Sequence, residues 1–225
     1  MKWLEERTKA GDDAGRPACE RRMQGREASA IDVAAEYEPI QRSQLPVRVK
    51  LLMALWRVIE CTAFGLSPGC LVFWRRFLLR CFGGQIASTA SVRRTSRIAC
   101  PWNLTMGPQS SLGERSRACC LAPIVIGERA CVGADVFLLT GGHDPRDPAF
   151  GLTRRPIVVG PGAWLATRCT VLPGVRIGAL CVIGAGAVVS RDTPERTVCV
   201  GNPSRVVGLR RWRDASDGLG LHSDA

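Results

Sequence analysis

His143 is the residue of this chain with the clearest chemical potential. It lies in the segment Gly141-Gly142-His143-Asp144, and the chain's other histidine is His222. Imidazole titrates near neutral pH, so His143 could act as a general base that removes the proton of an attacking hydroxyl group. A loop histidine can also simply hydrogen-bond to the backbone, and a single histidine does not define a site.

Two other groups of side chains, aspartates and cysteines, could take part in this chemistry. Asp144 could orient the imidazole, whereas Asp147 precedes Pro148 and is more typical of a turn. Six cysteines could offer a thiol nucleophile and an acyl-enzyme route, but several fall at small or inward positions of the repeat described below, which favours packing. They are Cys119, Cys120, Cys131, Cys169, Cys181 and Cys199.

The number and spacing of the cysteines give no sign of a metal site or a disulfide scaffold. The chain has 11 cysteines but no Cys-x-x-Cys pair and no apolar N-terminal signal segment. We therefore expect reduced thiols, a cytoplasmic protein and no metal. The longest uncharged apolar run, residues 61–74, is too short to span a bilayer.

A sixfold hydrophobic period predicts the fold of the region beyond Gly84. Aliphatic residues recur every six positions, the next residue is often glycine, and the fourth residue after the aliphatic one is usually small. The aliphatic positions are Ile86, Val92, Ile98, Met106, Leu112, Ile126, Val132, Leu138, Val159, Leu165, Val171, Ile177, Ile183 and Val189.

Six residues per face and three faces give an 18-residue coil whose parallel strands stack at roughly 4.8 Å. Residues 86–103, 106–123 and 126–143 each make one coil and residues 159–194 make two, with short inserts between the first three. The sequence therefore predicts a parallel β-helix of about five coils over residues 85–208.

The segments outside the repeat predict other structure. Residues 1–45 have mixed charge and no sustained period, which is typical of a disordered extension, and residues 209–225 form a basic and then disordered tail. Residues 46–84 predict two amphipathic helices broken at Ser67-Pro68-Gly69. These helices could cap the solenoid or, through residues 46–82, lie on the inner face of a membrane, because arginines flank their apolar stripes.

One interruption of the repeat, the loop 140–157, contains His143. It is rich in turn-forming and polar residues and leaves the solenoid at the end of the third coil. Long loops expelled from a regular scaffold are where function tends to lie.

The chain is also strongly basic. It carries 31 Lys and Arg residues against 20 Asp and Glu, a formal charge of +11, and lysine occurs only at positions 2, 9 and 50. Arginine favours bidentate contacts with phosphate, so an anionic ligand or surface is plausible, although a basic surface can also serve solubility.

The sequence resembles the hexapeptide-repeat acyltransferases. The resemblance rests on the hexads, the loop motif at 141–148, Gly-Ala-Trp-Leu-Ala at 162–166 and Val-Gly-Asn-Pro-Ser-Arg-Val-Val at 200–207. Residues 101–107 and Leu121-Ala122-Pro123 resemble the colanic-acid biosynthesis acetyltransferase branch, and the match covers about residues 46–210.

This resemblance implies a left-handed β-helix with an N-terminal helical region, a homotrimer with sites between neighbouring subunits, acetyl-CoA as donor and a sugar or polysaccharide hydroxyl as acceptor. The loop histidine of the family maps to His143. The family's coenzyme groove maps by motif to a set of residues on the later coils, and Trp102 and Asn103 are implied at the acceptor. The coenzyme set is Trp164, Ala166, Thr167, Ala185, Ser190, Arg191 and Arg205.

The chain departs from this branch at Cys119-Cys120, where an aromatic residue and asparagine are usual, and in its long N-terminus. Three other readings remain to be compared. A γ-class carbonic anhydrase needs three histidines around zinc. A xenobiotic acetyltransferase shares the fold, donor and base. A non-catalytic scaffold or nucleic-acid binder is a different class, but no interleaved aromatic and basic stripe supports nucleic acid.

Overall fold

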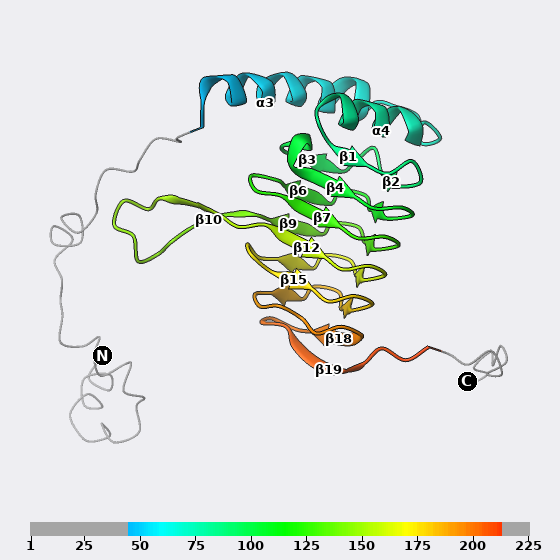
Figure 1. Ribbon diagram of the computed structural model, residues 1–225, viewed down its shortest axis with the longest axis vertical. Coiled ribbons are helices and arrows are strands. Elements are labelled where there is room, and N and C mark those ends of the chain that lie inside the picture. The colour runs from blue at the N-terminus through cyan, green and yellow to red at the C-terminus, as the bar shows by residue number, and fades with distance from the viewer. Residues whose placement is uncertain (1–44, 213–225) are drawn as a thin grey trace, which may run out of the picture.

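The protein is a β-solenoid with helices across its N-terminal end (Figure 1). The computed structural model describes residues 45–212, so residues 1–44 of the predicted extension and residues 213–225 of the predicted tail lie outside the described part. The predicted fold class is confirmed. The solenoid has five complete coils, and a sixth begins where Thr193 bridges to Ile177 and strand β18 pairs with β16.

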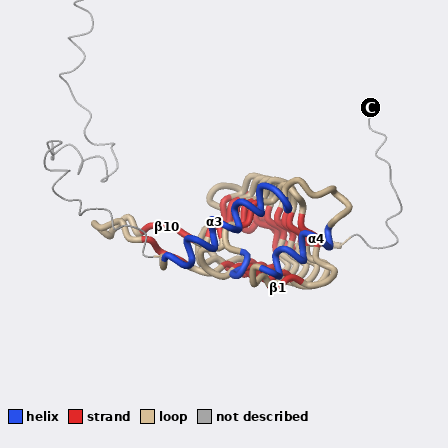
Figure 2. The backbone as a smooth tube through the Cα atoms, turned by 90° about the horizontal axis from the view of Figure 1, so that it is seen from above, coloured by secondary structure: helices blue, strands red, loops and turns tan. Residues whose placement is uncertain are grey.

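Each coil contributes one short strand to each of three faces, which surround the core (Figure 2). Face A contains β1 (Gln85–Ile86), β4 (Leu104–Met106), β7 (Ile124–Ile126), β12 (Ile157–Val159) and β15 (Arg176–Ile177). Face B contains β2 (Ser91–Val92), β5 (Ser111–Leu112), β8 (Cys131–Val132), β13 (Trp164–Leu165), β16 (Val182–Ile183), β18 (Thr197–Val200) and the antiparallel β19 (Arg205–Leu209). Face C contains β3 (Arg97–Ile98), β6 (Arg117–Cys119), β9 (Phe137–Leu139), β14 (Thr170–Val171) and β17 (Val188–Val189). We name the turns between faces the A–B, B–C and C–A corners.

The aliphatic hexad positions form the core, as the sequence predicts. All fourteen predicted residues are buried, and on face A the parallel register places Ile86 on Met106 and Met106 on Ile126. Burying such a side chain contributes about 1.5–3 kcal/mol, so the stack supplies much of the stability. The small positions are buried too, and on face C the second coil uses Ala118 where the others have a larger residue.

The glycine that often follows the aliphatic residue has a steric cause. A Cβ on Gly113 would lie 2.5 Å from the carbonyl carbon of Gly133 on the next coil. Real Cβ atoms do not approach backbone this closely, because the coils are separated by only one strand spacing.

The helical segment comprises α3 (Val47–Ile59), a π-helical turn η1 (Glu60–Phe64) and α4 (Val72–Cys81). The chain breaks between them at the predicted Ser67-Pro68-Gly69, where proline disfavours a continued helix. Within residues 45–212, no helix has the length and apolar character needed to cross a membrane.

Side chains of the helical segment form hydrogen bonds with the backbone groups at the open strand edges of the first coil. Arg80 donates to the carbonyl of Ile86 on face A, and Arg75 donates to that of Val92 on face B. On face C, Trp56 Nε1–H donates to the carbonyl of Ile98 (2.6 Å), and the backbone N–H of Ile98 donates to the Glu60 carboxylate (2.6 Å). Uncapped strand edges invite pairing with other chains, so the helices close the solenoid at this end.

Arg75 is the most heavily engaged of these caps. Its side chain is buried, and besides Val92 it donates to Ser67 Oγ and to the carbonyls of Pro68 and Gly69, each at 2.9 Å. It therefore joins the helix break to the edge of face B.

We expect Arg75→Met to lower the free energy of unfolding by about 3 kcal/mol, because the buried carbonyl of Val92 and the partly buried carbonyls of Pro68 and Gly69 would lose their donor. Urea unfolding measures this change. Arg48→Met, on the exposed side of α3, is the control and should stay within about 0.5 kcal/mol of the parent. Equal stability of the two variants would contradict the capping role.

Candidate active site

A hairpin expelled from the third coil carries His143. Its strands β10 (Gly141–His143) and β11 (Leu152–Arg154) pair antiparallel, with His143 opposite Leu152, and they project from the C–A corner between β9 and β12 (Figure 1). The N–H of Arg155 donates to the carbonyl of Thr140 at its base (2.9 Å). Gly141 packs closely there, since a Cβ would lie 2.7 Å from Leu121 Cδ1 and the leucine side chain would have to move.

Asp147 organises the tip of the hairpin, which confirms its predicted turn role. Its carboxylate accepts the N–H groups of Ala149 (3.0 Å) and Gly151 (2.9 Å). Between them, Phe150 has a left-handed backbone with φ of 49°. That conformation is unfavourable for a bulky residue, so the Asp147 hydrogen bonds help to hold it.

Phe150 in turn fixes the imidazole of His143. The two rings are stacked, with centroids 4.4 Å apart and planes 6° apart, and His143 Nδ1 lies 2.7 Å from the carbonyl oxygen of Phe150. A carbonyl oxygen can only accept, so Nδ1 must carry the proton. The Nε2 lone pair of this exposed ring is then free to take a proton from a substrate.

Asp144, which the sequence leaves open as an orienting residue, contacts the backbone of the hairpin. Its carboxylate accepts the N–H of Arg146 (2.9 Å), and this hydrogen bond lowers the pKa of Asp144 below its usual value. The partner of Nδ1 is the Phe150 carbonyl instead. The carbonyl and the ring of Phe150 therefore orient the imidazole of His143.

Four of the predicted coenzyme residues lie on face B or at the B–C corner of the later coils. Trp164 is half-exposed on β13, and Ala166 and Thr167 follow it at the corner. Ala185 occupies the same corner one coil further on, where the N–H of Gly186 donates to the carbonyl of Thr167 (3.0 Å). The side chains of Thr167 and Ala185 are exposed, which leaves this corner open to a ligand.

Arg205 begins β19, next to this corner. The residue before it, Ser204, donates its N–H to the carbonyl of Val188 on face C (2.9 Å). Its side chain is exposed and could meet a phosphate group.

The other predicted residues line the C–A corner, from which the hairpin departs. Ser190 and Arg191 follow β17 and are exposed, two coils beyond the hairpin. Trp102 and Asn103 lie on the 3-10 turn η2 (Pro101–Asn103) of the first coil. Trp102 packs against the core, and Asn103 Nδ2 donates to the carbonyl of Cys120 (2.8 Å), so both have structural contacts as well.

The cysteines are poor candidates for a nucleophile. Cys120, Cys169, Cys181 and Cys199 are buried, and burial raises the pKa of Cys169 to about 12. A thiol with this pKa is almost entirely protonated at neutral pH. Cys131 differs from the packing expectation, because its position on β8 points outward and is exposed.

Two residues important to this geometry were absent from the sequence-based site. Phe150 could have been suspected as the aromatic residue after Asp147-Pro148 in the expelled loop. Thr140 is fully buried at the base of the loop, where its hydroxyl accepts the N–H of Ala122 (3.0 Å) and donates to the carbonyl of Cys119. No sequence signal distinguishes it from other threonines.

Across residues 45–212 no group of three or more His, Cys, Asp or Glu side chains is arranged to hold a metal ion. The cluster that a γ-class carbonic anhydrase requires is therefore not found in this part of the chain.

Comparison with known proteins identifies the class. Residues 156–191 match the family model described as bacterial transferase hexapeptide (six repeats). WcaF of Escherichia coli K12, assigned to colanic acid biosynthesis as an acetyltransferase, is 39% identical over 156 residues, which cover 69% of this chain and 86% of that protein. The chain belongs to the hexapeptide-repeat acetyltransferase family.

Solved structures agree with this assignment. A maltose O-acetyltransferase from Clostridium difficile 630 has 25% sequence identity and a TM-score of 0.60, covering 72% of this chain and 84% of that one. A Vibrio cholerae hexapeptide-repeat acetyltransferase complexed with acetyl coenzyme A has 20% identity and a TM-score of 0.68, covering 80% and 98%. A galactoside acetyltransferase in complex with coenzyme A has 22% identity and a TM-score of 0.62, covering 87% and 92%. The last two support the fold alone.

Proposed function

We propose that this acetyltransferase moves an acetyl group from acetyl-CoA to a hydroxyl group of a sugar or exopolysaccharide precursor, with His143 as the general base. The observation that carries the proposal is the Nδ1 hydrogen bond of His143, which leaves Nε2 available on a hairpin of the hexapeptide-repeat solenoid. The colanic acid and maltose acetyltransferases to which the chain is similar support a carbohydrate acceptor.

Transfer is direct in this proposal. Nε2 takes the hydroxyl proton as the oxygen attacks the thioester carbonyl, and the tetrahedral intermediate then expels the coenzyme A sulfur, which receives that proton. The imidazolium formed in between is stabilised because Nδ1–H remains bonded to the Phe150 carbonyl at 2.7 Å. The buried thiols take no part.

The coenzyme in this proposal binds along the later coils. Thr167 and Ala185 offer small side chains at the open B–C corner, which allows close approach of a narrow chain. Arg191 and Arg205 offer guanidinium groups to its phosphates.

A homotrimer would bring the two halves of the site together. Within one chain, the hairpin that contains β10 projects outward from the C–A corner (Figure 1), whereas Thr167 and Ala185 follow β13 and β16 at the B–C corner. The hairpin of one solenoid could therefore meet the coenzyme corner of a neighbouring solenoid, as the sequence resemblance implies.

His143→Ala should lower turnover by a factor of about 10²–10⁴, because the base is lost, while leaving the affinity for coenzyme A unchanged. Labelled acetyl-CoA with a panel of oligosaccharide acceptors measures transfer, and calorimetry measures binding. His222→Ala, which changes the chain's other histidine, is the matched control and should be fully active. Parent-like turnover of His143→Ala would refute the assignment.

Mixing two inactive chains tests whether sites are shared between subunits. After joint refolding, His143→Ala and Ala185→Trp/Arg205→Gln chains should recover part of the activity, because some sites combine an intact hairpin with an intact coenzyme corner. No recovery in mixed oligomers would place both halves of the site in one chain.

The helical end has the character of a membrane-binding surface, and in this proposal it rests on anionic lipid. Val47, Leu51, Leu55 and Val58 recur along one side of α3 and are 54–71% exposed, opposite the side that carries Trp56 to the core. Phe73 and Phe77 extend the apolar surface on α4. The flanking cations Arg48, Lys50 and Arg57 suit acidic headgroups.

The chain should therefore sediment with vesicles that contain phosphatidylglycerol and stay in solution with pure phosphatidylcholine vesicles. Leu51→Ser/Leu55→Ser should reduce sedimentation at least about fivefold, because it removes apolar anchors. Val206→Ser/Leu209→Ser, which changes exposed apolar residues at the opposite end, should bind as the parent does. Sedimentation that the α3 substitutions leave unchanged would exclude this surface.

A further inference from the structure

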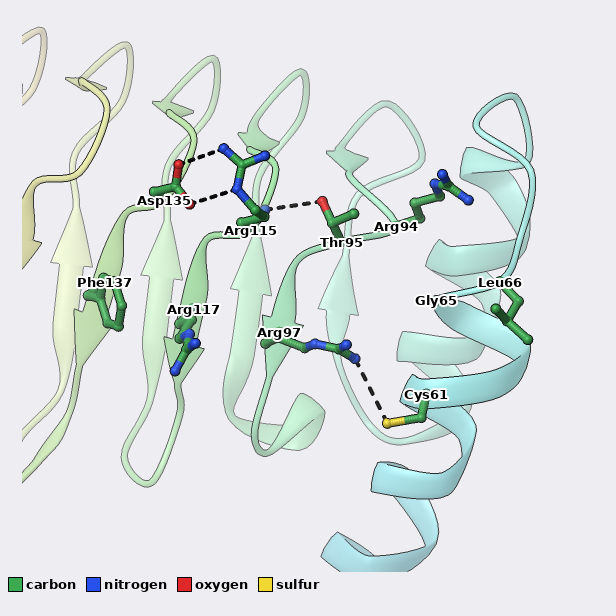
Figure 3. Close-up of a pocket in the computed structure, with 10 residues that line it drawn as sticks. All are labelled: Cys61, Gly65, Leu66, Arg94, Thr95, Arg97, Arg115, Arg117, Asp135 and Phe137. Carbon is green, nitrogen blue, oxygen red and sulfur yellow. Dashed lines mark hydrogen bonds and ion pairs between the residues drawn. The ribbon is translucent and has the colours of Figure 1, made fainter.

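An arginine-lined pocket on face C has no role in the proposed base chemistry or coenzyme groove. It has a volume of about 440 Å³ and lies between the end of the π-helical turn and the first three coils (Figure 3). Its walls include Arg94, Arg97, Arg115, Arg117 and Phe137. The volume is within the range of small-molecule sites.

The arginines are brought together by the coil register. Arg97 pairs with Arg117 and Arg117 with Phe137 on neighbouring strands, so the three outward side chains form one column. Strand spacing places the bases of successive side chains roughly 5 Å apart. The Arg97 guanidinium extends toward Cys61 (3.9 Å) and that of Arg117 toward Phe137, so the two positive charges border the pocket from neighbouring coils.

Protein carboxylates neutralise only part of this charge. Arg115 is paired in bidentate fashion with Asp135, at 2.9 and 2.7 Å, and Arg97 lies 3.8 Å from Glu60, which is already bonded to Arg57 at 2.7 Å. Among residues 45–212, no carboxylate lies within ion-pair distance of Arg94 or Arg117. The Arg117 guanidinium instead lies 5.2 Å from the Phe137 ring centre.

The pocket spans face C and the B–C corner of the first three coils, on the N-terminal side of the residues assigned to the coenzyme at the same corner. Phe137 begins β9, the strand that leads directly into the hairpin carrying His143. The residues assigned to the coenzyme are on the fourth and later coils, whereas the arginines are on the first two. A ligand anchored here would lie on the N-terminal side of a coenzyme bound along the later coils.

We propose that this pocket binds the negatively charged group, a phosphate ester or a carboxylate, of an anionic carbohydrate acceptor. This inference rests on the proposed function. Arg94, Arg97 and Arg117 supply charge-assisted hydrogen bonds to the oxyanion, and the half-buried Phe137 ring offers an apolar surface beside it.

Equilibrium binding tests the inference without requiring turnover. Glucose 1-phosphate, glucuronate and glucose are titrated calorimetrically into the full-length protein at low salt, where charge interactions are least screened. The variants are Arg117→Gln, which breaks no protein ion pair, and Arg97→Gln/Arg117→Gln. Arg176→Gln is the matched control, because Arg176 is an exposed, outward-facing arginine on a strand of face A.

At least one anionic sugar should bind more tightly than glucose, and its affinity should fall about tenfold in Arg117→Gln and further in the double variant. Arg176→Gln should bind as the parent does, and coenzyme A affinity should stay within about twofold in every variant. The preferred sugar then distinguishes phosphate from carboxylate.

Equal binding of the three sugars, or affinity that the pocket substitutions leave unchanged, would overturn the inference. So would a parallel loss of coenzyme A affinity, since the arginines would then serve the donor. None of these results depends on acetyl transfer, so the proposed function can stand if the pocket assignment fails, and the reverse also holds.

Discussion

The parallel backbone ladder between successive coils is the constraint on which the rest of this structure depends. Every inward residue lies above its counterpart on the coil below, as Ile86, Met106 and Ile126 do. An insertion within a strand would break this register, so the backbone leaves the solenoid at a corner between faces. The same ladder leaves open strand edges at the first coil. Buried polar side chains such as Arg75 and Glu60 close those edges, which explains why charged residues lie at the end of an apolar core.

The regularity of the solenoid also gives the candidate site its rigidity. The hairpin is tied to the C–A corner by Thr140, and its tip is held by Asp147. These contacts place Phe150 so that its ring and carbonyl both engage His143. The imidazole therefore receives a defined tautomer from backbone geometry, although it is exposed, and no carboxylate is needed for that purpose.

Much of the fold could be predicted from the sequence because one physical rule repeats. The aliphatic hexad residues report directly on burial, and the glycine positions report on the close approach of corners. Ala118 and Cys131 depart from the simple pattern, since alanine fills a large position and Cys131 faces outward. The position of a residue in the hexad therefore predicts whether its side chain faces the core or the outside better than its residue type does.

The site was less predictable, because its contacts depend on hairpin register and strand pairing, which the spacing of residues in the sequence does not reveal. His143 is distinctive in the sequence, but the partner of its ring is a backbone carbonyl that only the hairpin register brings near. The arginine pocket likewise depends on strand pairing that stacks Arg97, Arg117 and Phe137. Charge composition left an anionic ligand and a basic surface that serves solubility equally open, and the coil register was needed to show which arginines lie together.

The tautomer of His143 is the most direct test of the central claim that the hairpin frees Nε2 to act as a base. Long-range ¹H–¹⁵N correlation spectra of histidine-labelled protein distinguish the two neutral tautomers, and His143→Ala assigns the signals because the chain has only two histidines. The structure predicts that the neutral ring of His143 carries its proton on Nδ1. A ring protonated mainly at Nε2 would contradict the account, because the nitrogen assigned to catalysis would then carry the proton.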